Sequence, residues 1–453
     1  MSGPRRPPAT LLGLSWPLMI SFTTRSLLTS IDIPYAATLG DEAVAAIGLA
    51  FPLEFAFIAC WIGVSSALTS HLSRAFGEGD EARVEQLLRT TRDFVVVLSA
   101  FFLGLAGVVY AFAPRLGVDP AVAENFRWYA PIIVVGAALV GFWSAIPDSV
   151  VKAHHDTRST MVAGLITAFS NVALNTLFVF GFGWGIVGIA VATGFARAGA
   201  LAYALRRAAR LEAERRRTAP AATGKLLERP HRTLLVLGVP TALTFVLIGT
   251  EHLAVNAFLA RLDAGTASLA AYAIYHRASF LFLMPVVGIG VAIVPFVGRA
   301  VGAGRVDDVR SGLRDAFRFA VLYALLFVAP VCWLAAGPIA GWLGDAPATE
   351  ALATFAIRWA VPLAVLAASP FMLCRPVFEG VQRGVPGLVM GALRYLLLSV
   401  PLAYAGSRLA PTLGRAPFEG VLLGLVGGSA LVSIAFLAWL SRLLSAAQWP
   451  QPK

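Results

Sequence analysis

Long apolar segments separated by short polar connections cover nearly the whole chain. From Leu11 to Leu444, apolar runs recur that are each long enough to cross ~30 Å of hydrocarbon as a helix. The runs are continuously apolar rather than alternating at every second residue, which favours helices over the strands of a membrane barrel. The pattern therefore predicts an all-α polytopic membrane protein.

These runs define twelve predicted transmembrane helices. The first run lacks an A-x-A-like cleavage site, so we expect a span there and not a removed signal peptide. The predicted spans are residues 11–37, 43–70, 94–113, 128–150, 159–181, 185–205, 233–260, 267–298, 319–340, 352–374, 385–407 and 418–441.

The composition supports a membrane protein. Hydrophobic residues make up 58% of the 453 residues and charged residues 13%, whereas a soluble protein carries about 25% charged residues. The three cysteines lie in or beside apolar runs without paired spacing. We therefore interpret Cys60, Cys332 and Cys374 as packing residues rather than a disulfide framework or a metal site.

The formal net charge of +11 is unevenly distributed between the two predicted sides. Most Arg and Lys residues lie in one set of alternate connections, which includes 71–93, 206–232 and 299–318. The opposite set contains only Arg115, Arg127, Arg261, Arg358, Arg408 and Arg415. Because basic connections stay in the cytoplasm, we expect an inner (plasma) membrane protein with both termini cytoplasmic. Topology accounts for the charge, so no nucleic-acid partner is expected.

The chain divides into two similar halves. The polar stretch 206–232 is predicted to be a basic cytoplasmic linker between an N-lobe (residues 1–205, spans 1–6) and a C-lobe (residues 233–453, spans 7–12). The best internal match is "RAFGEG" (74–79) against "RAVGAG" (299–304). We interpret the paired glycines of this match as tight-turn residues without a ligand.

Six spans per half mean that both halves enter the membrane in the same direction. This predicts a parallel repeat of two pseudo-symmetric six-helix lobes, an arrangement typical of transporters with a site between the repeats.

Several motifs resemble those of the multidrug and toxic compound extrusion (MATE) family of secondary transporters. They are Pro17 and Asp32 in the first span, "LGDEAVAAIGLAFPL" (39–53), "RAFGEGD" (74–80), "NVALNTLFVFGFGWGIVGIAVAT" (171–193) and "PVVGIGVAIVPFVGRAVGAGR" (285–305). The resemblance rests on their order and spacing. It implies two six-helix lobes around a central cavity that opens alternately to each side. It also implies export of small organic compounds, driven by proton or sodium entry.

Asp32 is the main candidate for ion coupling. Placing a charged side chain at the middle of the bilayer costs ~2.5–3.5 kcal/mol. A carboxylate within a span is therefore expected to have a function that offsets this cost. Asn175 lies at similar depth in span 5, and Asn171 lies one turn deeper on the same face. Their amides can hydrogen-bond either form of the carboxyl group. Asp32 could then take up a proton outside and release it inside, or it could simply cap a helix or pair near the outer interface.

Two prolines are candidate hinges. Pro34 cannot donate a hydrogen bond to the Ser30 carbonyl, so protonation of Asp32 could change a local bend. Pro17 is the second candidate, in the first half of the same span. In the family, span 5 often carries an acid where Asn175 stands. Because this chain has no acid there, Asp32 is the main acidic candidate of the first half. The case for a sodium site built from several carboxylates is correspondingly weaker.

Arg25 and Glu54 are candidate cavity residues. Arg25 lies seven residues before Asp32 and so on nearly the same helix face. It could pair with Asp32 or with Glu54, which is also within a span. If it faces the cavity instead, it favours an anionic or zwitterionic substrate.

The second half offers further candidates. Glu251 lies near the centre of span 7. The resemblance implies an acid in this span that helps to bind the ion in sodium-coupled relatives. Glu251 stands about two residues away from the position of that acid. It is therefore an ion-coupling candidate, with pairing to Arg277 or Arg394 as the alternative. His276 and Arg277, within span 8, are candidate cavity residues. His276 could titrate near neutral pH or be a structural histidine.

Other chemistries are less well supported by the sequence. "HHD" (154–156) matches no strong zinc spacing, so we expect loop-surface residues and no metal site. Neither a phosphate-binding glycine loop nor a paired Asp-rich motif occurs, so we expect no catalytic residues and no cofactor apart from the coupling ion. The alternatives are a flippase for a lipid-linked precursor and a membrane-embedded enzyme. Arg25, Arg277 and Arg394 favour the flippase, because such proteins tend to have a cationic cavity. The expected partners are a small organic substrate and the bilayer, and we expect a monomer.

Overall fold

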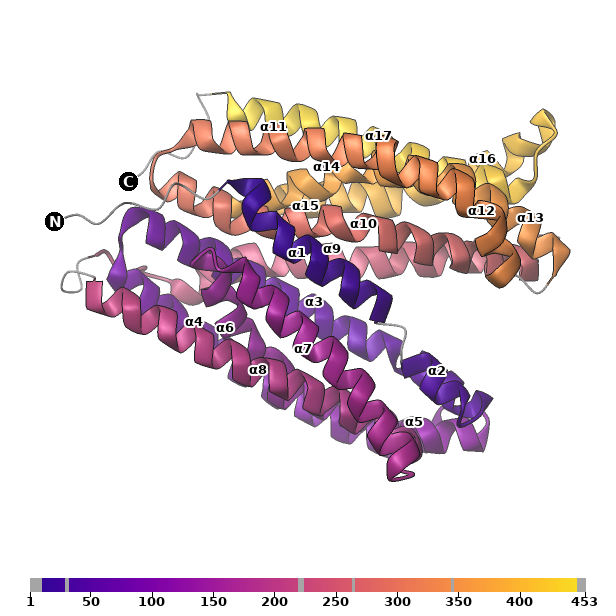
Figure 1. Ribbon diagram of the computed structural model, residues 1–453, viewed down its shortest axis with the longest axis horizontal. Helices are drawn as coiled ribbons and strands as arrows, with labels where there is room; N and C mark the ends of the chain where they lie inside the picture. The colour runs from indigo at the N-terminus through magenta and orange to yellow at the C-terminus, as the bar shows by residue number, and fades with distance from the viewer. Residues whose placement is uncertain (1–9, 29–31, 219–223, 263–264, 344–345, 446–453) are drawn as a thin grey trace. The chain divides into compact units, whose positions relative to one another are not determined.

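The computed structural model describes residues 10–28, 32–218, 224–262, 265–343 and 346–445 (Figure 1). Within these ranges nearly every residue is helical and no strand occurs. Eleven segments of this part of the chain are long and apolar enough to cross a membrane. The first predicted span is occupied by the shorter apolar helix α1 (Leu11–Leu28) and by α2 (Asp32–Ala37). Eleven of the twelve predicted spans are thus confirmed as helical segments of membrane-spanning length, and the described residues of the first form two shorter helices.

The helices of the first half follow the predicted spans in order. They are α3 (Asp41–Glu78), α4 (Glu81–Phe112), α5 (Pro120–Gly136), α6 (Phe142–Ala153), α7 (Thr157–Asn175) and α8 (Gly185–Thr218). One 3-10 turn, η1 (Ala113–Arg115), follows α4, and the π-helical segments η2 (Ala137–Gly141) and η3 (Thr176–Gly181) continue α5 and α7. Because α8 continues to Thr218, the predicted linker begins inside a helix.

The second half repeats this series. Its helices are α9 (Pro230–Leu259), α10 (Gly265–Gly302), α11 (Val306–Tyr323), α12 (Ala329–Leu343), α13 (Pro347–Phe355), α14 (Val361–Gly380), α15 (Val385–Ala392), α16 (Ser399–Leu409) and α17 (Pro417–Leu444). The segments η4 (Ala324–Val328), η5 (Ala356–Ala360), η6 (Leu393–Leu398) and η7 (Ala410–Leu413) join them. Helices α3 and α10 occupy equivalent places in the two halves and are both 38 residues long.

The chain forms two compact units. Of the described residues, those within 20–242 and 294–303 form the N-unit, and those within 10–19, 243–293 and 304–445 form the C-unit. In the N-unit, α3 packs on α5 and α6, and α7 packs on α8. In the C-unit, α17 packs on α14 and α16. Apolar side chains that face these contacts form the buried cores of the units.

The paired glycine motifs have two different roles. Gly79 and Gly304 have φ values of 72° and 70°, in the left-handed region, and end α3 and α10 in tight turns. Gly77 and Gly302 are helical, and their interpretation as turn residues is wrong. A Cβ on Gly302 would lie 2.3 Å from the Arg74 carbonyl oxygen, and one on Gly77 would lie 2.4 Å from that of Arg299. These glycines let the ends of α3 and α10 cross in direct backbone contact within the N-unit.

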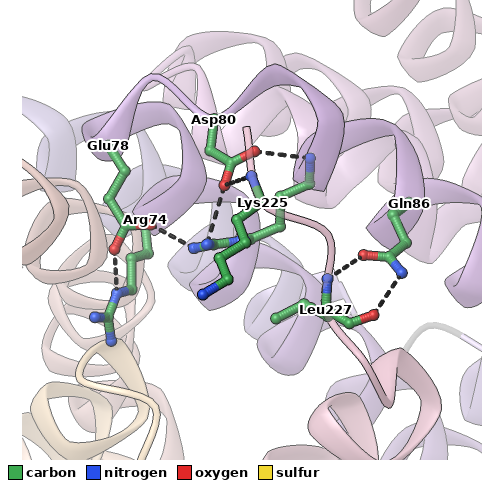
Figure 2. Close-up of polar contacts among 7 residues, drawn as sticks. Arg74, Glu78, Asp80, Gln86, Lys225 and Leu227 are labelled. Atoms are coloured by element: carbon green, nitrogen blue, oxygen red, sulfur yellow. Dashed lines mark hydrogen bonds and ion pairs between the residues drawn. The ribbon is translucent and has the colours of Figure 1, made fainter. Parts of the chain in front are cut away.

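The segment before α9 is fixed to the turn between α3 and α4 within the N-unit (Figure 2). Asp80 begins α4 as its N-cap and accepts hydrogen bonds from the backbone N–H groups of Arg83, at 3.0 Å, and Lys225, at 3.3 Å. Gln86 donates to the Leu227 carbonyl at 2.9 Å and accepts from the Leu227 N–H at 2.8 Å. The side chains of the first turns of α4 thus satisfy backbone groups of this non-helical segment.

Candidate functional site

Asp32 lies at the meeting point of three helices of the N-unit. It is the first residue of α2 and is half-buried. Asn175 on α7 donates from Nδ2 to Asp32 Oδ1 at 2.7 Å, and Thr193 on α8 donates from Oγ1 to Asp32 Oδ2 at 3.3 Å. Neutral donors therefore reach both carboxyl oxygens, although the one hydroxyl hydrogen of Thr193 is shared with the Ile189 carbonyl at 3.2 Å.

The two asparagines of α7 complete this polar cluster. Asn175 Nδ2 also lies 3.4 Å from Asn171 Oδ1, and Asn171 donates to Thr193 Oγ1 at 3.1 Å. The structure thus brings together the three first-half residues predicted for ion coupling. Asn175 is 0% exposed, and its Oδ1 has no hydrogen-bond partner among the described residues. An acceptor is available there for the proton of a neutral carboxylic acid, once the amide turns.

Helix α2 is attached to α7 beside this cluster. The hydroxyl groups of Tyr35 and Thr176 are 2.5 Å apart, and the Tyr35 hydroxyl donates to the Val172 carbonyl at 3.3 Å. Pro34, one of the predicted hinges, lies within α2 between Asp32 and Tyr35. The predicted gap at the Ser30 carbonyl lies outside the described residues. The other predicted hinge, Pro17, lies inside α1.

A second carboxyl group lies near the first. Glu54 on α3 accepts a hydrogen bond from the Tyr129 hydroxyl on α5 at 3.4 Å. Arg197, one turn after Thr193 on α8, is close enough to act electrostatically on both Asp32 and Glu54. Its guanidinium lies 5.5 Å from the centre of the Phe57 ring. The Arg25 side chain is not among those described, so its pairing stays a prediction.

Sequence reasoning missed Thr193, Tyr129 and Arg197. Threonine and tyrosine are common in membrane helices, and little distinguishes these two from others. Arg197 carried a usable signal because it is a guanidinium inside a predicted span, the same signal that drew attention to Arg25. Its position one turn from Thr193 places both side chains on one face of α8.

The C-unit contains a separate polar cluster. Glu251 on α9 interacts electrostatically with Arg394 of η6, whereas Arg277 is exposed. Of the two pairings predicted for Glu251, the structure therefore favours Arg394. The Arg394 guanidinium lies 5.1 Å from the Phe371 ring and 4.9 Å from the Tyr395 ring. Its Nε and Nη1 have no hydrogen-bond partner in the described part of the chain.

His276 belongs to an aromatic group in the same unit. Its ring centre lies 4.5 Å from that of His252, and Tyr272 stacks on His252 at 5.5 Å. Phe280 also stacks on His276, with ring centres 6.3 Å apart. The structure thus gives His276 aromatic neighbours and no paired acid among them.

The "HHD" stretch joins α6 to α7. His154 Nε2 lies 2.8 Å from Glu212 Oε1, and His155 Nε2 lies 3.2 Å from the Pro295 carbonyl oxygen. Desolvation alone would raise the pKa of Asp156, but hydrogen bonds from Arg207 and Ser159 outweigh it and hold that pKa below its ordinary value. Each residue has a structural partner, and the described ranges contain no group of three or more His, Cys, Asp or Glu that could hold a metal ion.

The duplicated helical fold and the polar clusters inside its spans define the class: a multi-pass membrane protein with carboxyl groups within its transmembrane segments. The sequence model of the MatE family matches residues 17–177 and 240–405, one stretch in each half. The chain belongs to this family of transporters, as its motifs predicted.

Relatives and solved structures agree with this membership. The chain is 25% identical over 434 residues to a FAD transporter of Shewanella oneidensis, with 92% of each chain covered. It is 25% identical over 289 residues to the probable multidrug resistance protein YoeA of Bacillus subtilis, covering 61% of this chain and 60% of that protein.

Two solved structures show the same fold. A MOP superfamily transporter from Pyrococcus furiosus superposes with a TM-score of 0.85 at 21% identity, covering 96% of this chain and 95% of the other. The Vibrio cholerae MATE transporter VcmN gives a TM-score of 0.84 at 24% identity, covering 97% of both chains. The predicted fold class is confirmed.

Proposed function

We propose that the protein is a secondary antiporter that exports small organic compounds in exchange for protons, with Asp32 as the coupling group. The observation that carries the proposal is the neutral hydrogen bonding of Asp32 by Asn175 and Thr193. A carboxylate held by a guanidinium within the membrane keeps its charge, whereas one held by amide and hydroxyl groups can also exist as the neutral acid.

The surroundings of Asp32 can accommodate both protonation states. When Asp32 is ionised, the Asn175 amide N–H and the Thr193 hydroxyl donate to it. When Asp32 is protonated, the buried Asn175 Oδ1 can accept its O–H after the amide turns. Rotation of the Asn175 amide therefore lets Asp32 keep a hydrogen bond in both protonation states.

The charge of the neighbourhood supports uptake of one proton. Among the described side chains, the carboxylates of Asp32 and Glu54 share the influence of Arg197. With both acids ionised this group has a net charge of minus one, and a single proton neutralises it. Because net charge is costly inside a membrane, proton uptake favours a conformation in which the cluster is shielded from water. This is how proton entry would drive alternating access in the duplicated fold.

The test is transport by everted membrane vesicles under separately imposed pH and sodium gradients, in which cellular efflux is measured as uptake of the probe into the vesicle lumen. Ethidium is the probe, and the variants are Asp32→Asn and, as a matched control on the exposed start of α3, Asp41→Asn. We expect pH-driven efflux by the native chain and by Asp41→Asn, and none by Asp32→Asn at equal protein amount. Efflux by Asp32→Asn that remains fully driven by the pH gradient would remove Asp32 from the mechanism. If efflux by the native chain follows only the sodium gradient, the coupling ion is sodium and not the proton.

A second candidate substrate class is a planar anionic compound such as a flavin nucleotide. Two observations favour it: the relative named as a FAD transporter, and the Arg394 guanidinium, which has unpartnered N–H groups beside aromatic rings. Transport of radiolabelled FAD would be compared with that of ethidium in the same vesicles. Loss of FAD transport in Arg394→Gln, but not in the exposed control Arg408→Gln, would favour this class.

A further inference from the structure

The C-unit contains an apolar groove that the proposed function does not use. It lies between α11, α14 and α17 and has a volume of about 230 Å³. An apolar cavity of ~150 Å³ is already large enough to hold benzene. Six of its lining residues define its walls: Phe317 and Val321 on α11, Leu366 and Pro370 on α14, and Ile434 and Leu437 on α17.

The groove offers its occupant no free polar group. Among the described residues that line it, two serines are the only polar ones, and both are bonded to their own unit's backbone. Ser369 donates to the Val365 carbonyl at 2.6 Å, and Ser433 donates to the Ala367 carbonyl at 2.6 Å. A polar ligand would lose hydrogen bonds to water without replacement there, so the fitting occupant is a hydrocarbon chain.

The groove opens at the surface of these helices. Val321 is 41% exposed and Ile434 is 65% exposed at its rim. Both belong to segments long and apolar enough to cross the membrane. Such a surface faces lipid in the bilayer, so acyl chains are the hydrocarbon available to fill the groove.

Positive charge lies at one end of the groove. Arg314 and Arg318 flank Phe317 on α11, both are exposed, and neither forms an ion pair with a described residue. Arg310, two turns before Phe317, donates to the Leu444 carbonyl at 2.6 Å and pairs with Asp307 at 3.1 Å. This contact joins the start of α11 to the end of α17, and it leaves the two unpaired arginines available to a ligand.

We propose that this groove binds one acyl chain of an anionic phospholipid whose headgroup is held by Arg314 and Arg318. The charge at the groove's end distinguishes this occupant from a neutral phospholipid, which would fill the groove equally well but gain nothing from the arginines. Asp315 lies three residues before Arg318 and so beside it on α11, but the two form no ion pair, and together with Arg314 the three side chains keep a net positive charge.

The experiment is native mass spectrometry of the purified full-length protein released from detergent. The protein is mixed with equal amounts of palmitoyl-oleoyl phosphatidylglycerol and palmitoyl-oleoyl phosphatidylcholine, which differ only in the headgroup. Each basic side chain near a membrane surface raises the affinity for anionic lipid by about fivefold. We therefore expect a clear preference of the native chain for phosphatidylglycerol, which is lost in the double variant Arg314→Gln/Arg318→Gln.

Two control pairs separate the parts of the proposal. Arg383→Gln/Arg408→Gln removes two exposed arginines from elements that do not line the groove and should keep the preference. Ala430→Trp fills the groove and should lower the retention of both lipids, whereas Leu431→Trp, on the exposed face beside it, should not.

Three results would overturn the proposal. They are equal retention of the two lipids by the native chain, an unchanged preference in Arg314→Gln/Arg318→Gln, and undiminished phosphatidylglycerol binding by Ala430→Trp. If the tryptophan variant does not fold, the arginine variant decides alone, because its side chains are exposed. None of these outcomes depends on transport or on Asp32.

Discussion

Asn175 is the residue that most clearly connects the fold to the proposed chemistry. It is fully buried at the end of α7 and donates to Asp32, while its own Oδ1 lacks a partner in the described part of the chain. A buried polar atom without a partner is costly, so its retention needs a reason. A second state in which this oxygen accepts a proton from Asp32 would be such a reason.

Asn175→Leu is expected to impair proton coupling without leaving a cavity beside Asp32. The leucine has a similar volume but removes the donor to Asp32 Oδ1, a hydrogen bond to a charged group worth ~1.5–3 kcal/mol. We expect the rate of pH-driven ethidium efflux to fall by roughly tenfold or more, as that energy implies. The matched control is Thr167→Val, on the same helix, whose hydroxyl bonds only to the Ala163 carbonyl at 3.1 Å. Native-like efflux by Asn175→Leu would show that the amide has no part in coupling.

The candidate site could be predicted only in part from the sequence. Asp32, Asn171 and Asn175 were found because polar residues stand out in apolar spans and because their distances from the span ends match. Thr193 and Tyr129 were missed because the rotation of one helix against its neighbour is set by side-chain packing, which hydropathy does not report. Arg197 was missed despite its charge, and only the structure relates it to both acids.

At the scale of elements, the crossing of α3 and α10 depends on glycine. Membrane helices gain little from hydrophobic contact with one another and instead need small residues where their backbones approach. Gly77 and Gly302 provide this, since a Cβ on either would lie within 2.4 Å of a carbonyl oxygen of the facing helix. The equivalent positions of the two halves thus pack against each other within the N-unit.

Gly302→Ala should therefore destabilise the protein. The added methyl group would overlap the Arg74 carbonyl, 2.3 Å away, and overpacking of this kind costs ~1–3 kcal/mol. The control is Gly104→Ala in α4, where nothing lies within 4 Å of the added atom and helix propensity favours alanine by ~0.5–1 kcal/mol. Thermal unfolding in detergent, followed by size-exclusion chromatography, should give a lower midpoint for Gly302→Ala only. Equal midpoints for the two variants would contradict the close crossing.

Element boundaries were predicted less well than element positions. Hydropathy placed a span at 43–70, whereas α3 continues to Glu78, and it placed another at 185–205, whereas α8 continues to Thr218. The missing turns are helical but polar, so they lie beyond the apolar run that the pattern detects. The segment 224–229 is likewise ordered by Asp80 and Gln86 through backbone hydrogen bonds, for which the sequence carries no periodic signal.

At the scale of the whole molecule, the sequence repeat and the compact units are different divisions. The repeat places all of α9 and α10 in the second half, yet residues 230–242 and 294–303 belong to the N-unit. Similarity between halves reports a shared pattern of spans, whereas a compact unit reports which residues touch. The glycine crossing of α3 and α10 is one contact that draws part of the second half into the N-unit.

The orientation in the membrane is the whole-molecule property that the charge distribution predicts. Because basic connections remain in the cytoplasm, we expect the α10–α11 side inside and the α16–α17 connection outside. Single cysteines at Thr412→Cys and Ser311→Cys, both exposed, would be introduced after replacing Cys60, Cys332 and Cys374 by alanine. A membrane-impermeant maleimide should label Thr412→Cys in intact cells and Ser311→Cys only after permeabilisation, while the cysteine-free chain stays unlabelled. The reverse pattern would place the termini outside and would reverse the direction in which proton entry could drive export.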